Sequence, residues 1–104
     1  MEITPRELKS RLEGGEKIAI VDVREPAEVA ICSLANAKWI PLKEILERID
    51  EIKEEGLIVL YCHHGLRSMQ AALMLTRKGI PNVVSLRGGI DAWAEEIDPS
   101  LARY

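Results

Sequence analysis

The sequence predicts one α/β domain, in which helices cover both faces of a mostly parallel central sheet. Two observations lead to this prediction. Short β-branched apolar runs alternate with amphipathic segments along the whole chain, an order that is typical of strand–helix–strand units. The chain is also only 104 residues long, which is enough to bury one hydrophobic core but not two. Residues 1–104 are therefore expected to form a single domain without an internal repeat or linker.

Two helices and two strands are expected in the first part of the chain. Thr4 and Glu7 form a capping box around Pro5, so an amphipathic helix is expected to begin there. Pro26 favours the first turn of a second helix, where its missing N–H group is not needed. The expected elements are a helix from Thr4 to Gly14 and Gly15, a strand over residues 17–22 (KIAIVD), a helix from Pro26 to about Cys32 and a small strand over residues 38–40.

Helices and strands are expected to alternate again from residue 42 onwards. Ile45, Ile49 and Ile52 recur at helical spacing between charged residues, which predicts an amphipathic helix over residues 42–54. The helix predicted over residues 68–78 is apolar on most sides, so it is expected to pack against the sheet. The remaining expected elements are strands over residues 57–61 and 82–86, a turn at Gly88 and Gly89, a helix over residues 90–97 and an irregular tail from Asp98.

Composition and charge restrict the classes of function. Apolar residues make up 47% of the chain and charged residues 30%, a balance that excludes a mostly disordered protein. No apolar run reaches the length of a membrane span and the N-terminus lacks the features of a signal peptide, so we expect a cytoplasmic protein without a membrane partner. The net charge of -3 argues against nucleic acid as a partner. Residues 56–90 hold four basic residues and no acidic one. This excess of positive charge either attracts a small anion or results from a chance distribution of charged side chains on solvated faces.

Cys62 is the strongest candidate for a catalytic residue. It follows the apolar run LIVLY and opens the segment CHHGLRS, so a buried strand delivers the thiol into a turn that precedes a helix. Thiolates are stabilised by converging backbone N–H groups, by a helix N-terminus and by a nearby cation. We expect the turn to supply the N–H groups, a helix beginning near Ser68 to supply the dipole, and Arg67 to supply the cation.

Acidic and basic residues after the first predicted strand are expected to support this site. In open α/β sheets, ligands bind beyond the carboxyl ends of the strands, which is where Asp22 and Cys62 both fall. Asp22, Arg24 and Glu28 are expected to form a set of ion pairs and hydrogen bonds that fixes the loop after the strand. Asp22 and Arg24 would then lie close to the catalytic loop.

The second cysteine and the two histidines have alternative interpretations. Two cysteines in a cytoplasmic protein are expected to be reduced thiols rather than a structural disulfide. Cys32 is either a resolving thiol for Cys62 or a small buried residue at a helix end. His63 and His64 suggest a metal site or a Cys–His pair, but a fourth ligand is not apparent. We therefore favour the interpretation that both imidazoles are loop side chains flanking the mouth of the site.

Three motifs resemble those of the rhodanese-like domain family, the family of single-domain sulfurtransferases. They are VDVREPAE at residues 21–28, YCHHGLRS at residues 61–68 and LRGGIDAW at residues 86–93. Their order and spacing match the family nearly end to end, which makes a chance resemblance improbable. One segment departs from the pattern: residues 32–37 read CSLANA where the family commonly has GHIPGA. The turn after the second helix is therefore expected to differ in shape, which would affect substrate access if it borders the site.

The resemblance implies a sulfurtransferase that acts by double displacement. The Cys62 thiolate would take the sulfane sulfur of a small anionic donor, such as thiosulfate or a persulfide, and pass it to a thiol or a cyanide-like acceptor. Arg67 would hold the oxygens of an anionic donor. No metal or organic cofactor is implied, whereas the tail IDPSLARY resembles rhodanese domains of sulfur-carrier pathways and implies a sulfur-relay protein as a partner. The implied substrate-binding residues are His63, His64, Gly65, Leu66, Arg67 and Ser68.

Three other functions remain open at this point. A cysteine phosphatase has five residues between its cysteine and arginine, whereas Cys62 and Arg67 are separated by four. The shorter ring of N–H groups suits one sulfur atom better than a phosphate, and no general acid can be assigned. A binding module without activity is the second alternative, and the retained Cys62 argues against it. The third is a domain that mainly relays persulfide sulfur between proteins.

Overall fold

The computed structural model describes residues 1–53 and 56–104, and a five-stranded sheet lies at its centre. Within this described part of the chain every strand pairing is parallel, and the strand order is β1-β5-β4-β2-β3. The strands are β1 (Glu2–Ile3), β2 (Ile18–Asp22), β3 (Lys38–Trp39), β4 (Leu57–Tyr61) and β5 (Val83–Leu86). The prediction of a parallel α/β sheet is therefore confirmed.

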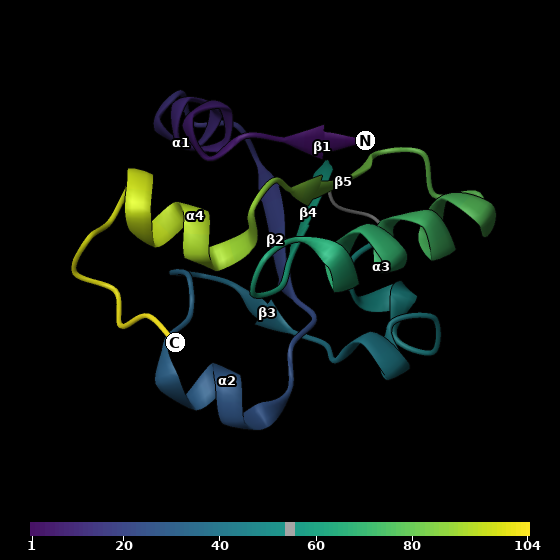
Figure 1. Ribbon diagram of the computed structural model, residues 1–104. Helices are drawn as coiled ribbons and strands as arrows, with labels where there is room; N and C mark the ends of the chain where they lie inside the picture. The colour runs from purple at the N-terminus through teal and green to yellow at the C-terminus, as the bar shows by residue number, and fades with distance from the viewer. Residues whose placement is uncertain (54–55) are drawn as a thin grey trace.

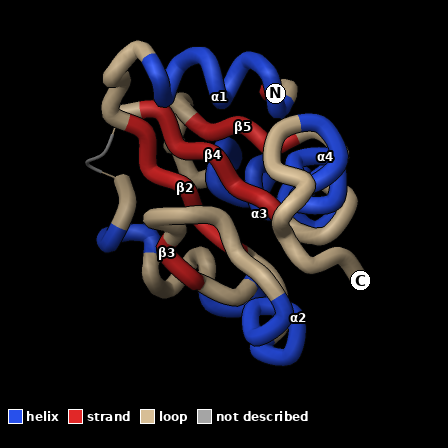
Figure 2. The backbone as a smooth tube through the Cα atoms, turned by 90° about the vertical axis from the view of Figure 1, so that its left-hand side faces the viewer, coloured by secondary structure: helices blue, strands red, loops and turns tan. Residues whose placement is uncertain are grey.

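Helices cover both faces of the sheet, as the sequence predicts (Figures 1 and 2). On one face, Leu8 and Ile90 pack in a cluster with Val59 of the sheet. On the other face, Leu75 and Ile45 pack with a second set of strand residues. The helices are α1 (Pro5–Glu13) and α4 (Gly89–Glu96) on the first face, α3 (Leu66–Arg77) with the 3-10 turns η1 (Leu42–Glu44) and η2 (Ile49–Glu51) on the second, and α2 (Pro26–Ile31) beyond the carboxyl ends of the strands.

The helix predicted over residues 42–54 is wrong. The structure has the two short turns η1 and η2 there instead, and the expected end at Glu54 lies outside the described residues. The apolar residues explain the error, because Ile49 and Ile52 are three residues apart, a spacing that a 3-10 turn satisfies as well as an α-helix. The backbone N–H of Ile52 donates to the carbonyl of Ile49, and Ile45 and Ile52 are both buried as the pattern required.

A strand that was not predicted and a helix with a different start are two further differences from the prediction. Strand β1 was not expected, because a strand of two residues is too short to show any period in the sequence. It nevertheless pairs with β5, so the N-terminus lies at an edge of the sheet. Helix α3 begins at Leu66 rather than near Ser68, which changes how the catalytic segment is built.

The register of the two central strands brings the predicted site residues to the same edge. Asp22 at the end of β2 lies opposite Tyr61 at the end of β4. Cys62 and Arg24 therefore leave the sheet from neighbouring strands and in the same direction. No helix in the described ranges is long and apolar enough to cross a membrane.

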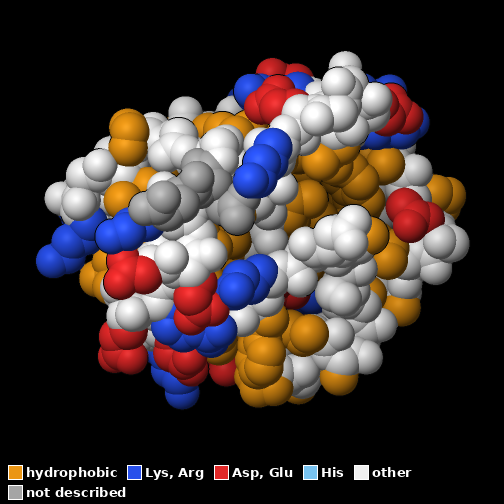
Figure 3. All heavy atoms as spheres, turned by 180° about the vertical axis from the view of Figure 1, so that it is seen from behind, with side chains coloured by type: hydrophobic (Ala, Val, Ile, Leu, Met, Phe, Trp, Pro, Cys, Tyr) orange, Lys and Arg blue, Asp and Glu red, His pale blue; other side chains and the backbone are white. Residues whose placement is uncertain are grey.

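The segment that departs from the family pattern forms a turn around Asn36. Asn36 adopts φ 63°, and asparagine is one of the few residues that tolerate this left-handed conformation. It occupies the position of the second glycine in GHIPGA, so a residue that tolerates positive φ stands where the family commonly has glycine. The expected difference in the shape of this turn stays a prediction. The same segment borders a cavity of about 500 Å³ that is also lined by Leu12, Ile20 and Trp93. Hydrophobic side chains gather in a hollow on this face of the molecule (Figure 3), and residues 62–68 do not line the cavity.

Candidate active site

The Cys62 sulfur lies in a small ring of hydrogen-bond donors just beyond β4. The residue is only 1% exposed, and its Sγ accepts hydrogen bonds from the backbone N–H of Gly65 at 3.1 Å and of Ser68 at 3.4 Å. The Ser68 hydroxyl lies 3.5 Å from the same sulfur. Backbone donors were expected from the segment between His63 and Arg67, and the structure assigns this role to Gly65 and to the more distant Ser68.

The start of α3 explains why these two groups face the sulfur. Gly65 is the residue before the helix and has φ 108°, a conformation that side chains oppose. Ser68 is the third residue of the helix, so its N–H group has no partner within the helix and is free to donate to the sulfur. The helix was expected to begin near Ser68, but it begins two residues earlier, so Ser68 lies inside its first turn. Its hydroxyl donates to the Gly65 carbonyl and bonds Ser85.

Helix α4 fixes the other side of the segment that follows Cys62. The N–H groups of Ile90 and Asp91 donate to the carbonyls of Cys62 and His63, at 2.9 and 3.1 Å. A side chain at Gly89 would place its Cβ 2.3 Å from the His63 oxygen, so only glycine fits at this approach. Gly88 and Gly89 were predicted to form a strand–helix turn, and this contact was not predicted, although the place of the two glycines in the third motif was a usable signal.

Arg67 is paired with a carboxylate instead of standing free. Its two terminal nitrogens donate to the two carboxylate oxygens of Glu28, at 2.6 and 2.8 Å. Donation from Arg67 lowers the pKa of Glu28 to about 2. The same bonds raise the pKa of Arg67, and the nearby Cys62 sulfur contributes to that shift. The expected cation is therefore beside the thiol, but a fixed anion already neutralises its charge.

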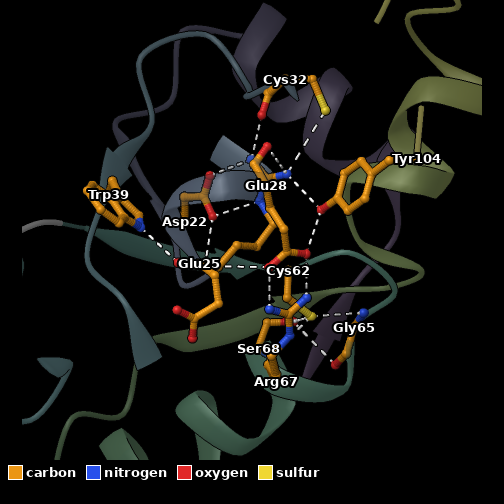
Figure 4. A network of polar contacts seen from close by, with 11 residues as sticks. Asp22, Glu25, Glu28, Cys32, Trp39, Cys62, Gly65, Arg67, Ser68 and Tyr104 are labelled. Atoms are coloured by element: carbon orange, nitrogen blue, oxygen red, sulfur yellow. Dashed lines mark hydrogen bonds and ion pairs between the residues drawn. The ribbon is translucent and has the colours of Figure 1, made fainter. Parts of the chain in front are cut away.

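Asp22 and Arg24 form a buried ion pair, as expected. Asp22 lies in the same network of polar contacts as Glu28 and Tyr104 (Figure 4). The Nε and Nη2 atoms of Arg24 donate to the two Asp22 oxygens at 2.9 and 2.7 Å. Arg24 Nη2 also donates to the Cys32 carbonyl, and the Tyr61 hydroxyl donates to Asp22. Both members of the pair are almost fully buried, so they anchor the loop between β2 and α2.

Tyr104 connects this buried pair to the pair at the mouth. Its hydroxyl accepts a hydrogen bond from Arg24 at 2.8 Å and donates one to Glu28 at 2.8 Å. Burial, assisted by Glu28, raises the pKa of Tyr104 to about 12, so the hydroxyl keeps its proton at neutral pH. The tyrosine ring also stacks on His63 at a centroid distance of 3.9 Å. The sequence predicts an irregular tail from Asp98 here, and no pattern in that tail pointed to Tyr104 as a residue of the site.

A family model for the rhodanese-like domain matches residues 4–96 of the chain. This chain belongs to the rhodanese-like domain family. The three motifs that suggested the family supply the catalytic loop, Glu28 and the start of α4. The domain is 40% identical to a protein named sulfurtransferase from Allochromatium vinosum, over 97% of this chain and 94% of that protein.

Two more comparisons place the domain among its relatives. It is 38% identical to the probable adenylyltransferase/sulfurtransferase MoeZ of Mycobacterium tuberculosis, over 98% of this chain. It spans about a quarter of that relative, because the match covers 26% of MoeZ. The crystal structure of a rhodanese-like domain protein from Staphylococcus aureus matches with a TM-score of 0.82 and 34% identity, covering 99% of this chain and 97% of that one. The predicted fold class is therefore confirmed at the level of the family.

The histidines of this rhodanese-like domain lie at the rim with Asp91. The His63 ring lies between His64 and Tyr104, and His64 Nε2 is 3.7 Å from an Asp91 oxygen. The ligand atoms of His63, His64 and Asp91 lie within 4.8 Å of one another, so Asp91 supplies a third candidate metal ligand that the sequence did not indicate. Asp91 is already bound at both oxygens by Arg103. The expectation that no metal is needed stays a prediction.

Cys32 lies beside the network rather than within the ring of donors. Its thiol is not in a disulfide, and its Sγ is 4.0 Å from Arg24 Nη1. Its carbonyl accepts from the same guanidinium. The residue is only partly buried, so neither interpretation from the sequence is settled, and the resolving role stays a prediction.

Proposed function

We propose that this domain is a sulfurtransferase that carries sulfane sulfur as a persulfide on Cys62. The supporting observation is the pair of N–H groups from Gly65 and Ser68 that donate to the sulfur. These donors stabilise a thiolate before transfer and a terminal persulfide sulfur after it. The family membership and the relatives named as sulfurtransferases support the same class of reaction.

In the first half of the reaction, the Cys62 thiolate attacks the outer sulfur of the donor. With thiosulfate, a new S–S bond forms to Cys62, the donor S–S bond breaks, and sulfite leaves with the electron pair. With an alkyl persulfide the leaving group is a thiolate, which takes up a proton. Both donors leave the same Cys62 persulfide, and no electrons are gained or lost overall.

In the second half, an acceptor attacks the terminal sulfur of the persulfide. Cyanide leaves as thiocyanate, and a thiol leaves as a new persulfide after its proton is transferred. The Cys62 thiolate is restored in both cases. The backbone N–H groups of Gly65 and Ser68, which donate to the sulfur, are placed to stabilise the thiolate as it forms again.

A second candidate is a relay in which the donor or acceptor is another protein. Leu66 is 81% exposed, although it directly precedes Arg67 in the catalytic loop. Single exposed apolar side chains are ordinary on protein surfaces, so Leu66 only leaves room for contact with a partner protein. The similarity to MoeZ adds support, because that relative combines an adenylyltransferase with a sulfurtransferase in its name. In this proposal, a sulfur-relay protein replaces the small donor and Cys62 keeps the same role.

Intact mass spectrometry tests the covalent step. The purified protein is incubated with thiosulfate or with glutathione persulfide, and then with or without cyanide. We expect a gain of about 32 Da, one sulfur atom, that cyanide removes. Cys62→Ser is expected to abolish the gain without loss of the fold, which circular dichroism checks. Cys32→Ser is the matched control, because it removes the other thiol and should retain the gain.

Each outcome of this experiment bears on the proposal. Loss of the gain in both cysteine variants would show that both thiols are required, and retention of the gain in Cys62→Ser would show that the sulfur resides on Cys32. No gain in the parent protein with either donor would overturn sulfur transfer from small donors, and would leave a protein persulfide as the donor or a binding module. Phosphatase activity with an aryl phosphate in the absence of sulfur transfer would favour the cysteine phosphatase alternative.

A further inference from the structure

The Arg67–Glu28 pair can determine which sulfur donor the domain uses. This inference rests on the proposed sulfurtransferase function. Arg67 is the cation of the catalytic loop, and both of its terminal nitrogens are bound to Glu28. This two-point contact is the geometry with which arginine would bind the sulfonate oxygens of thiosulfate. Glu28 is therefore already bound to the Arg67 guanidinium, which is the group that an inorganic donor would need to bind.

Glu28 is fixed in place by more than Arg67. Its carboxylate also accepts the backbone N–H of Glu25 at 3.1 Å and the hydroxyl of Tyr104 at 2.8 Å. The side chain of Glu28 is 17% exposed, whereas that of Arg67 is 33% exposed. The carboxylate is thus held by α2 and by the C-terminal tail, and Arg67 is the more exposed partner. A donor that binds Arg67 has to break the Arg67–Glu28 pair, and the negative charge of Glu28 is then left without its cation.

Thiosulfate and an alkyl persulfide place different demands on this arrangement. Thiosulfate is a dianion whose leaving group, sulfite, carries two negative charges. It has to displace one carboxylate from Arg67 while that carboxylate repels it at short range. An alkyl persulfide presents its outer sulfur to the N–H groups of Gly65 and Ser68 and has no sulfonate to bind. Its leaving thiolate does not require the guanidinium.

We propose that Glu28 is the donor-selecting residue of this site, because by holding Arg67 it disfavours inorganic thiosulfate relative to a sulfane sulfur carried on an organic thiol. The preferred substrate class is then a persulfide, on a small thiol or on a protein cysteine. Glu28 acts through Arg67 and is a positioning residue rather than a catalytic one.

The test compares donor selectivity in Glu28→Gln with that of the parent protein. Thiocyanate formation is measured with cyanide as acceptor, and kcat/KM is determined for thiosulfate and for glutathione persulfide. We expect the ratio of the two values, thiosulfate over persulfide, to rise about tenfold in Glu28→Gln, through a lower KM for thiosulfate. Methanethiosulfonate, a monoanion with the same sulfane sulfur, should show a smaller rise, because it lacks one of the charges that Glu28 repels.

Three variants control this measurement. Glu25→Gln removes the same charge from the neighbouring exposed position, which has no bond to Arg67, and should change the ratio less than twofold. The double variant Glu28→Gln with Arg67→Gln should lose the rise, because the gain requires a free guanidinium. If Glu28→Gln does not fold, Glu28→Asp replaces it: the shorter carboxylate breaks the two-point contact and should raise the ratio about threefold.

The outcomes separate this inference from the proposed function. A parent protein that gains no sulfur from either donor would contradict the proposed function itself. A parent protein that transfers sulfur, combined with an unchanged or lower ratio in folded Glu28→Gln or Glu28→Asp, would overturn only the donor-selecting role. An equal fall in kcat/KM for both donors would assign Glu28 a purely structural role and would also overturn the inference.

Discussion

The domain contains two arginine–carboxylate pairs with similar geometry and very different surroundings. Arg24 and Asp22 meet at two points, 2.9 and 2.7 Å apart, with side chains 0% and 2% exposed. Arg67 and Glu28 also meet at two points, 2.6 and 2.8 Å apart, but their side chains are 33% and 17% exposed. A buried pair cannot change partners without leaving a charge in the interior, whereas water can solvate a pair at the surface. The same contact therefore serves as an anchor in one place and as an exchangeable contact in the other.

The largest effect on stability is expected from Arg24→Ala. The change leaves the Asp22 carboxylate buried without its cation, which should lower the free energy of unfolding by about 3–5 kcal/mol. Urea denaturation measures this loss. Arg11→Ala is the matched control, because Arg11 also binds a carboxylate, that of Glu16, at two points but on the surface. A loss no greater than that of Arg11→Ala would show that burial does not distinguish the pairs.

Tyr61→Phe should have the second largest effect. The Tyr61 hydroxyl donates to Asp22 and accepts the backbone N–H of Leu34, and the residue is fully buried. Its removal leaves that N–H group without its partner and takes one donor from Asp22, at an expected cost of about 1–3 kcal/mol. Thermal and urea unfolding measure the change. Equal stability of the variant and the parent would mean that the buried cluster tolerates a missing donor, contrary to its role as an anchor.

Arg67→Ala should change stability little and activity more. Exposed ion pairs contribute about 0.2–1 kcal/mol, so the free energy of unfolding should fall by no more than this. Thiosulfate use should fall roughly tenfold, because the variant leaves the Glu28 charge unpaired beside Cys62. Unfolding curves and steady-state kinetics on the same preparation separate the two effects. A stability loss as large as that of Arg24→Ala would contradict the expectation that the more exposed pair contributes less to stability than the buried one.

The pH dependence of stability should reveal the smallest effect. The lowered pKa of Glu28, about 2 against an ordinary value of 4.5, means that folding favours the ionised carboxylate. Its contribution is therefore present above pH 4.5 and is lost as the pH falls towards 2. The difference in unfolding free energy between the parent and Glu28→Gln should be about 1 kcal/mol or less near pH 6 and should shrink towards pH 3. A difference that grows on acidification would contradict the sign of this shift.

Much of the site could be predicted because it depends on neighbouring residues in the chain. The end of β4 delivers Cys62, and the requirement for glycine at residue 65 follows from a turn that leads directly into a helix. The alternation of strands and helices likewise placed Asp22 and Cys62 at one edge of the sheet. The helix over residues 42–54 failed because three-residue spacing fits two kinds of helix, and only the packing of Ile45 and Ile52 decides between them.

The contacts that set the electrostatics of the site could not be predicted in this way. Arg67 and Glu28 are 39 residues apart in sequence, and Tyr104 and Glu28 are 76 residues apart. Whether an arginine near a thiol is free or paired depends on how α2 and the tail are oriented, and no local pattern encodes that. The motif VDVREPAE pointed to Glu28 as part of an ion-pair set but did not indicate its partner.

The contact between α4 and the catalytic segment has a consequence for protein engineering. The first N–H groups of α4 bind the carbonyls of Cys62 and His63, and Gly89 has no room for a side chain there. The shape of the loop therefore depends on residues 86–91 as well as on residues 61–68. If residues 61–68 were grafted into another scaffold, the loop would lack the hydrogen bonds and the close approach that α4 supplies. Redesigned loops should therefore be selected together with variation at residues 86–91.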